Sequence, residues 1–484
     1  MDTKKILGML KKAVIVYWLF VLMIYLVAGD GFHYTTVTSD SLSPVTVVGE
    51  IVDGVEVTQR MVIPADTLHS VELCAATYGR SNTGLLHIEV QDEQEQVLSG
   101  ASVEVSSFKD GVYTTITLNQ PIEGRKGESV TLRITSEGAS SGNAVSMYSG
   151  NMVVTGRFDI VQSIAQEDLY RFNDLEGAGK LCVKLTGMQT LSFYKTYWII
   201  VSAIFAAAAL YIKRSLVRMR AGKNSLFAAL AMTVTRYRFL IKQLVSRDFK
   251  TKYKRSVLGM AWSFLNPLMT MCVQYIVFST LFKSSTSNYP VYLLSGIVFF
   301  NFFNEAVNMG MTSIIGNASL IKKVYMPKYI YPVSRILSSL VNFGLALIPL
   351  LLVMILTGTP PRPALLLLLF DVLCLVGFVI GMGLILATCM TFFQDTQFLW
   401  GVVSMMWMYL TPIFYTESII PAKFLTLFHI NPLYQYITFA RICIIDGVSP
   451  EPMAYLWCVL SSMVVLVLGI FVFKKNQDKF VLYL

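Results

Sequence analysis

The chain has 484 residues, of which 54% are hydrophobic and only 14% are charged. Soluble domains carry charges on roughly 25% of their residues, so this composition excludes an ordinary cytosolic enzyme and indicates a membrane protein. The net charge of +9 averages two unlike regions, because residues 30–195 hold 21 acidic and 11 basic residues while the rest of the chain is strongly basic. We therefore expect one water-exposed domain within a basic, α-helical polytopic membrane protein.

Eight stretches are apolar and long enough to span a membrane, which takes about 20 largely apolar residues. In chain order they are residues 13–28, 196–212, 257–282, 290–315, 331–357, 364–392, 397–414 and 453–473. Residues 416–452 are too polar and too often interrupted by proline to span simply. They predict paired short helices that re-enter the membrane, which requires that their backbone be buried in protein or line a cavity.

Basic residues flank the first two spans and the last one, and basic loops stay in the cytoplasm. They occur in residues 1–12, in residues 213–223 and in the tail 474–484. This asymmetry predicts cytoplasmic termini and places residues 29–195 outside. A cleaved signal peptide is the alternative interpretation of the first span.

The outside region shows strict alternation of apolar and polar residues, which is typical of strands. Examples are residues 86–91, 112–118 and 130–135, with turn residues between them. We expect an all-β, jelly-roll-like sandwich from about residue 45 to 155, followed by a partly helical connector over 156–195. Exposed aromatic residues on such a domain could contact a glycan, with packing as the alternative; the candidates are Tyr78, Phe108, Tyr113 and Tyr148.

The sequence contains no pattern for a metal site or for an ATP-binding loop. None of the seven cysteines lies in a CxxC or Cys/His spacing, and no G-x-x-x-x-G-K-[ST] motif occurs. Transport energy must therefore come from another chain or from an ion gradient. Cys74 and Cys182 fall in the outside region, where they could form a disulfide or remain free and buried.

The few ionisable residues near apolar runs are Glu305, Arg335, Asp371 and Asp395. Glu305 alone is weak support for coupled ion transport, and a structural role is the alternative. The glycines Gly377, Gly381 and Gly383 fit the small-residue spacing that lets membrane helices approach closely.

A basic amphipathic helix precedes the third span, within the cytoplasmic region 213–256. Its polar side carries Arg247, Lys250, Lys252, Lys254 and Arg255, and Tyr253 lies among them. Such a helix lies on the cytoplasmic surface, and attraction to anionic lipid is the simplest interpretation.

This segment resembles the interface helix of the permease subunits of type-2 ABC exporters of the O-antigen and teichoic-acid class. The matching residues are Arg247, Asp248, Tyr253, Ser256, Leu258, Gly259, Trp262 and Pro267. Residues 320–327 resemble the coupling helix of that family, 411–415 the end of its fifth span, and 431–441 its re-entrant segment. The resemblance covers residues 236–484 in the right order. Gln394 departs from it, because many members have arginine there before the aspartate that corresponds to Asp395.

The resemblance implies a six-span permease core over 257–473 that acts as a homodimer in a bacterial cytoplasmic membrane. Two separate ABC ATPase subunits would bind ATP and Mg²⁺, and this chain would hold no cofactor and bind no nucleic acid. The substrate would be a lipid-linked glycan or teichoic-acid-like polymer. The first 235 residues lie outside the resemblance, among them the first span, the outside domain and the second span. Alternatives are an exporter of lipids or small amphipathic drugs, and a membrane receptor for an envelope glycan.

We also hypothesise roles for particular residues. The ATPase would push on a segment that contains Asn317, Leu320, Ile321, Lys322 and Lys323, and the basic interface helix would attract the lipid diphosphate. Aromatic residues would line the channel near its outer gate, with an aromatic belt at the membrane surface as the alternative. These are Trp407, Tyr409, Phe414, Tyr415, Tyr434 and Tyr436.

Overall fold

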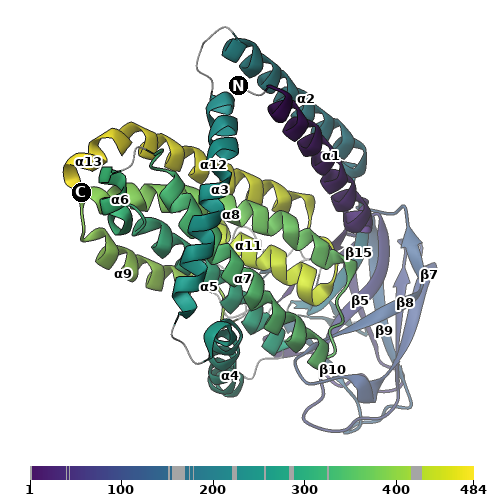
Figure 1. Ribbon diagram of the computed structural model, residues 1–484. Helices are drawn as coiled ribbons and strands as arrows, with labels where there is room; N and C mark the ends of the chain where they lie inside the picture. Colours follow the sequence, from purple (N-terminus) through teal and green to yellow (C-terminus); the bar gives the residue numbers. More distant parts are fainter. Residues whose placement is uncertain are drawn as a thin grey trace. The chain divides into compact units, whose positions relative to one another are not determined.

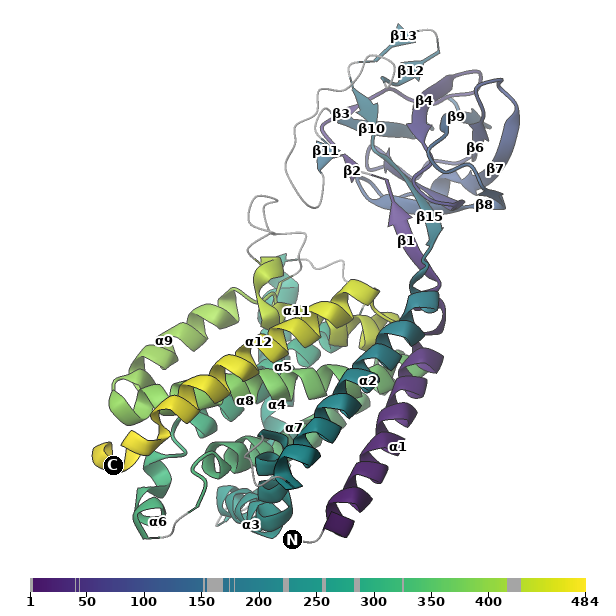
Figure 2. The same ribbon diagram turned by 90° about the horizontal axis from the view of Figure 1, so that it is seen from above.

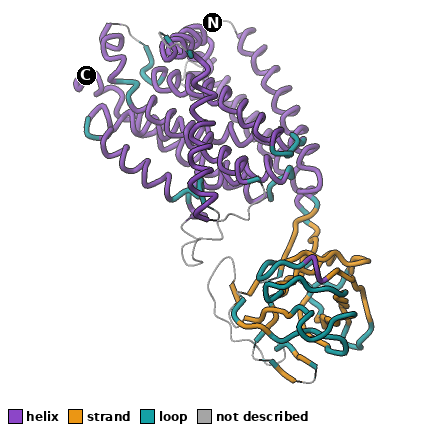
Figure 3. The backbone as a smooth tube through the Cα atoms, turned by 90° about the horizontal axis from the view of Figure 1, so that it is seen from below, coloured by secondary structure: helices purple, strands orange, loops and turns teal. Residues whose placement is uncertain are grey.

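The computed structural model describes residues 3–484 except 40, 43, 151–152, 155–168, 174, 178, 221–225, 255–257, 283–287, 324–325 and 416–427. Two compact units result. The described residues of the helical unit fall within 3–32, 193–415 and 428–484, and the β unit lies within 33–192. All long helices belong to the first unit and all strands to the second (Figure 3).

The β unit is a sandwich of two antiparallel sheets with alternating burial along the strands. One sheet has the order β1-β15-β5-β10-β14, with β8 and β3 (Thr46–Val47) attached, and the other has the order β13-β12-β4-β9-β6-β7. A small separate pair joins β2 (Ser41–Leu42) to β11 (Val153–Val154). The longer strands are β1 (Tyr34–Thr38), β4 (Glu56–Val62), β5 (Thr67–Ala76), β6 (Leu85–Gln91), β7 (Val97–Glu104), β8 (Tyr113–Glu123), β9 (Ser129–Glu137), β10 (Ser146–Gly150) and β15 (Val183–Thr190). Their inward apolar residues form one core that includes Leu73, Ile88 and Ile134.

The prediction of a partly helical connector over 156–195 is wrong in its described part. Strands β12 (Arg171–Phe172), β13 (Leu175–Glu176), β14 (Lys180–Leu181) and β15 occupy residues 171–190. β15 pairs with both β1 and β5, so the chain enters and leaves the sandwich on neighbouring strands. The sandwich therefore runs from residue 34 to 190, well beyond the predicted 45–155. The alternation of buried Val183, Leu185 and Gly187 with more exposed residues could have predicted strand β15 from the sequence.

The helical unit has the order that the hydropathy pattern predicts. Its helices are α1 (Thr3–Ala28), α2 (Phe193–Arg220), α3 (Leu226–Tyr253), α4 (Trp262–Phe282), α5 (Tyr289–Met311), α6 (Ala318–Lys323), α7 (Ile330–Leu356), α8 (Leu368–Phe392), α9 (Thr396–Tyr409), α11 (Pro432–Arg441), α12 (Pro452–Asn476) and α13 (Phe480–Tyr483). α1 and α2 lie side by side as a hairpin (Figures 1 and 2). Tyr17 and Tyr197 each donate a hydrogen bond to a backbone carbonyl of the opposite helix.

Seven helices in the described part of the chain are long and apolar enough to cross a membrane. The expected span at 397–414 is not among them, because α9 is helical over only 14 residues. At 1.5 Å per residue this is about 21 Å, less than the roughly 30 Å of a hydrocarbon core. Eight spans are thus not confirmed. Of the predicted re-entrant pair, α11 and the π-helix Ile442–Asp446 are present, and residues 416–427 lie outside the described residues.

Close helix packing confirms the interpretation of the glycines. Gly383 on α8 lies against Gly310 of α5 and Ile336 of α7, and Gly377 and Gly381 lie against α12. A Cβ atom at Gly377 would meet the Ser462 hydroxyl, and one at Gly381 would meet the Val465 carbonyl. Gly469 on α12 lies against Gly381 in the same way. Because backbone meets backbone here, only glycine fits, as in other close helix pairs of membrane proteins.

Candidate functional site

The end of α3 and one face each of α4, α5 and α7 enclose a cavity of about 300 Å³. Helical spacing explains which side chains line it. On α5 these are Val298, Asn301, Phe302 and Glu305, and on α7 they are Ser339, Asn342, Phe343 and Ala346. Both sets follow the i, i+3, i+4, i+7 pattern of one helix face. The cavity size is at the lower end for ligand pockets, which measure roughly 300–1,000 Å³.

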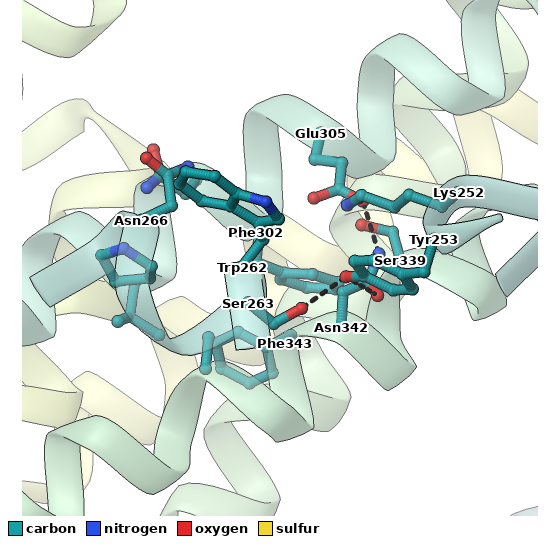
Figure 4. Close-up of a pocket in the computed structure, with 14 residues that line it drawn as sticks. Lys252, Tyr253, Trp262, Ser263, Asn266, Phe302, Glu305, Ser339, Asn342 and Phe343 are labelled. Carbon is teal, nitrogen blue, oxygen red and sulfur yellow. Dashed lines mark hydrogen bonds and ion pairs between the residues drawn. The ribbon is translucent and has the colours of Figure 1, made fainter. Parts of the chain in front are cut away.

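A chain of polar contacts joins the four helices at this cavity (Figure 4). The Lys252 ammonium donates to Glu305 Oε1 at 2.8 Å, and Asn342 Nδ2 donates to the same oxygen at 2.8 Å. The Tyr253 hydroxyl donates to Asn342 Oδ1 at 3.0 Å and also contacts the Ser263 hydroxyl. Lys252 and Glu305 are about one-third to two-fifths exposed, so water screens their attraction in part.

Aromatic rings form the apolar wall of the cavity. Phe302 and Phe343 are buried, with ring centres 4.7 Å apart, whereas Trp262 at the start of α4 is 46% exposed. A cavity with one exposed indole, buried phenyl rings and several hydroxyl and amide groups suits a ligand that has both apolar faces and hydroxyls.

Asp248 attaches the interface helix to α7. It is buried, with Arg247 Nη2 2.8 Å from its Oδ1 and Arg335 Nε 3.2 Å from its Oδ2. A buried carboxylate is stable only when it is paired, and here two guanidinium groups pair with it. The Arg-Asp motif at 247–248 thus has a structural role that the sequence did not reveal.

The predicted basic cluster divides into paired and unpaired residues. Arg247 and Lys252 each have a carboxylate partner, whereas Lys250 and Lys254 are exposed and make no ion pair among the described residues. Arg255 lies outside the described residues. Among the described residues of this cluster, the unpaired charges that could attract anionic lipid are therefore those of Lys250 and Lys254.

The predicted coupling segment has an anchored side and an exposed side. Ile321 is buried and Leu320 packs beside it, in a cluster with Tyr331 and Phe480. Asn317 is buried and donates to the Ser313 carbonyl. Lys322 and Lys323 are exposed at the end of α6. A force on the exposed lysines would thus be transmitted to α7 and α8 by packed side chains.

The aromatic residues assigned to the outer gate lie in different environments. Tyr409 is 60% exposed, and Trp407 is half-buried with its indole N–H 2.7 Å from Asn431 Oδ1. Tyr415 is half-buried, and its hydroxyl donates to the Tyr409 carbonyl at 2.5 Å. Phe414, Tyr434 and Tyr436 are buried within the helical unit. Of these six residues, Tyr409 therefore has the largest exposed surface for contact with a substrate.

In the β unit, the structure brings three of the four candidate aromatic residues to one face. Phe108 packs in the sandwich core and is only 6% exposed, so it is not a surface contact. Tyr113 and Tyr148 are half-buried over the thiols of Cys74 and Cys182, and Tyr78 is exposed. Both cysteines are free and buried, and burial raises the pKa of Cys182 to about 11.

Comparison with known proteins identifies the part of the chain that carries the cavity. Residues 239–445 match the family model of the ABC-2 type transporter. They form an ABC-2 type transporter domain. All fourteen residues that line the cavity lie in the ABC-2 domain, and the β unit lies outside it. The predicted type-2 ABC permease family is therefore confirmed for this domain, and the chain is a multi-pass membrane protein.

Curated relatives match about half of the chain. The O-antigen export system permease protein RfbA of Klebsiella pneumoniae is 28% identical over 245 residues, which cover 50% of this chain and 93% of that protein. The protein of the same name from Myxococcus xanthus is 29% identical over 248 residues, which cover 50% of this chain and 95% of that protein. The capsule polysaccharide export inner-membrane protein CtrC of Neisseria meningitidis serogroup B is 26% identical over 204 residues, covering 42% and 76%.

Sequence reasoning found Lys252 and Tyr253 but missed the partners that complete the site of the ABC-2 domain. Asn301, Ser339 and Asn342 are polar residues inside apolar spans, at helical spacing from other lining residues. That spacing was a usable signal. Nothing in the sequence indicated that Glu305 pairs with Lys252, because 53 residues separate them in the chain.

Proposed function

We propose that this chain is the permease subunit of an ATP-driven exporter that moves a lipid-linked polysaccharide across the bacterial cytoplasmic membrane. The observation that carries the proposal is the ABC-2 domain, whose relatives are named as permeases of O-antigen and capsule polysaccharide export. The chain would act as a homodimer with two separate ATPase subunits, and both of its termini would be cytoplasmic. Catalysis would belong to the ATPase subunits.

The cavity beside α3 is proposed as the place where the substrate head group first binds. Aromatic walls suit a sugar ring, and the hydroxyl and amide groups can exchange hydrogen bonds with sugar hydroxyls. Lys252 would bind the diphosphate. Since Glu305 holds Lys252 in the structure, an incoming diphosphate would compete with that carboxylate. Lys250 and Lys254 would first concentrate the anionic lipid, each contributing about 1 kcal/mol near a membrane surface.

Force would reach this cavity along two connections. An ATPase subunit would press on Lys322 and Lys323, and the cluster around Ile321 would pass the displacement to α7. The Asp248–Arg335 pair would move α3 together with α7. Because the cavity is lined by both α3 and α7, such movement would change its shape.

The experiment expresses the full chain together with its neighbouring genes, purifies it with any phosphate-loop ATPase that binds it, and reconstitutes the complex in liposomes. Lipid-linked polysaccharide from the same cells should stimulate ATP hydrolysis, whereas the free lipid should not. Ala346→Trp, which fills the cavity, should abolish the stimulation but leave the complex intact. Leu352→Trp on the same helix, at a position that is 50% exposed, is the matched control. Stimulation that survives Ala346→Trp would refute the cavity as the substrate site, and failure to copurify any ATPase would refute the exporter.

A further inference from the structure

The outer face of one sheet of the β unit carries a group of side chains that the sandwich core does not use. Cys74 on β5 and Cys182 beside it form a small cluster of their own, separate from the core. The backbone N–H of Cys74 donates to the Cys182 carbonyl at 3.0 Å, so Cys182, which lies between β14 and β15, is beside β5. Tyr113 and Tyr148 cover both thiols, which explains why residues on an outer face are 0% and 1% exposed.

The two tyrosine rings reach this position from opposite sides of β5. Tyr113 on β8 is paired in register with Cys74, and the Tyr148 carbonyl on β10 accepts the Cys182 N–H at 2.7 Å. Both side chains are only half-buried, so parts of their surfaces face water. The sheet therefore presents two tyrosines fixed on a floor of small side chains.

A carboxylate and a third tyrosine complete the group at the end of β5. Asp110 Oδ1 accepts the Thr77 N–H at 2.7 Å, which fixes the carboxylate, and Oδ2 accepts the Tyr148 hydroxyl at a long 3.5 Å. The next residue after Thr77 is Tyr78, which is 43% exposed and has a φ of +56°. A bulky residue in this left-handed region is uncommon and is held there only by its surroundings. We call Tyr78, Asp110, Tyr113 and Tyr148 the tyrosine patch.

The charges around the tyrosine patch are balanced. Lys184 lies 4.0 Å from the centre of the Tyr113 ring and is 3.7 Å from Glu72, and Arg80 stacks on Tyr78 and is paired with Glu50 at 2.9 Å. Both nearby cations thus have carboxylate partners, whereas Asp110 makes no ion pair among the described residues. The patch therefore favours a ligand with hydroxyl donors over an anionic one.

We propose that the tyrosine patch binds a neutral sugar ring of the exported polysaccharide. The apolar C–H face of the sugar would lie on the exposed surfaces of Tyr148 and Tyr78, and a sugar hydroxyl would donate to Asp110 Oδ2 in place of the long contact from Tyr148. Rigid aromatic side chains give much contact area at little entropic cost, and one fixed carboxylate orients the ring. This inference rests on the proposed function, because it takes the ligand to be part of the same polymer.

The test measures binding of the purified full-length chain, in lipid nanodiscs, to immobilised neutral polysaccharides: dextran, mannan, and the neutral polymer of the cells that encode the chain. Asp110→Ala should weaken binding about tenfold or more, because it removes the hydrogen bond to a charged carboxylate. Tyr148→Ala should also weaken binding about tenfold or more, because it removes the aromatic surface on which the sugar lies. Tyr148→Phe keeps the ring and should bind nearly as well as the native chain. Tyr34→Ala is the matched control, because Tyr34 is an exposed tyrosine on β1 of the same sheet, paired with Thr190.

Several outcomes would overturn the inference. The inference fails if the native chain binds no neutral polysaccharide, or if it prefers an acidic polymer such as alginate. It also fails if Tyr148→Ala and Asp110→Ala both bind as well as the native chain, or if Tyr34→Ala weakens binding as much as they do. Each variant is first checked for native thermal unfolding. Binding here is read without ATPase, so it is separate from the exporter assay. Sugar binding without polymer-stimulated ATP hydrolysis would refute only the proposed function. Polymer-stimulated hydrolysis without sugar binding would refute only the proposed role of the tyrosine patch.

Discussion

The guanidinium carbon of Arg441 lies 3.5 Å from the centre of the Tyr292 ring. The same buried side chain donates hydrogen bonds to the carbonyls of Pro412 at 2.7 Å, Ile413 at 3.2 Å and Tyr292 at 3.2 Å. Arg441 ends α11, Pro412 and Ile413 follow α9, and Tyr292 is in α5. One cation therefore holds α11 to the irregular segment that follows the short helix α9, because two carbonyls of that segment accept hydrogen bonds from it at once.

Replacing Arg441 with lysine should destabilise the helical unit although the charge is kept. An ammonium cannot reproduce the planar fork that donates to three carbonyls and stacks on a ring. We expect a loss of about 1–3 kcal/mol, the cost of leaving buried acceptors unpaired. Thermal unfolding in detergent measures it. Arg362→Lys is the control, because exposed Arg362 also donates to a backbone carbonyl, that of Asp446. Equal stability of the two variants would contradict this role of Arg441.

The pair Asp248 and Arg335 should show energetic coupling in a double-mutant cycle. Asp248→Asn leaves Arg335 without its carboxylate partner, and Arg335→Gln leaves Asp248 paired with Arg247 alone, so each should lower stability, while the double variant should lose less than their sum. Contacting charged residues typically couple by about 0.5–3 kcal/mol. In the reconstituted exporter, both single variants should also reduce polymer-stimulated hydrolysis. Strict additivity would show that α3 and α7 are not joined through this pair.

Glycine should be required where α8 meets α12. Gly381→Ala and Gly469→Ala would each place a methyl group against backbone atoms of the opposite helix. Such overpacking costs roughly 1–3 kcal/mol. Gly344→Ala on α7 is the matched control, since a Cβ there meets nothing within 4 Å. We expect lower unfolding temperatures for the first two variants and an unchanged unfolding temperature for the control. Wild-type stability of Gly381→Ala would mean that the helices lie farther apart.

The thiols of Cys74 and Cys182 should be almost unreactive in the folded β unit at neutral pH. Burial raises the pKa of Cys182 to about 11 and also raises that of Cys74. Only the thiolate reacts, and the thiol form dominates below the pKa, so alkylation should accelerate about tenfold per pH unit until pH reaches the pKa. Unfolding should restore an ordinary pKa of about 8.5 and fast labelling.

Pulsed iodoacetamide labelling followed by peptide mass spectrometry measures this reactivity. A cysteine introduced at the exposed position Ser106 provides the reference rate in the same domain. Labelling of Cys182 as fast as that of the reference at neutral pH would show that the strands over these thiols open readily.

The local patterns of the sequence determined most of the secondary structure, because periodicity depends only on neighbouring residues. Long apolar runs predicted α4, α5, α7, α8 and α12 to within about five residues at either end. They also predicted α1 and α2, but α1 begins well before its apolar run and α2 ends well after its own. Strict alternation predicted β6, β8 and β9. The residues around Arg247 and Trp262 also identified the family, which the ABC-2 match confirms. The helical connector was wrong because β15 depends on pairing with β1 and β5, which are distant in the chain.

Tertiary structure alone decided which side chains meet. Glu305 looked isolated in the sequence, yet it accepts hydrogen bonds from Lys252 and Asn342. Phe108 and Tyr148 were equal candidates for glycan contact in the sequence, but the fold places Phe108 in the core and Tyr148 on the surface beside Asp110. Composition and periodicity fix whether a segment enters a membrane or a sheet, since burial acts on each segment's own side chains. Ion pairs and binding surfaces form between segments far apart in the chain, so only the packed fold reveals them.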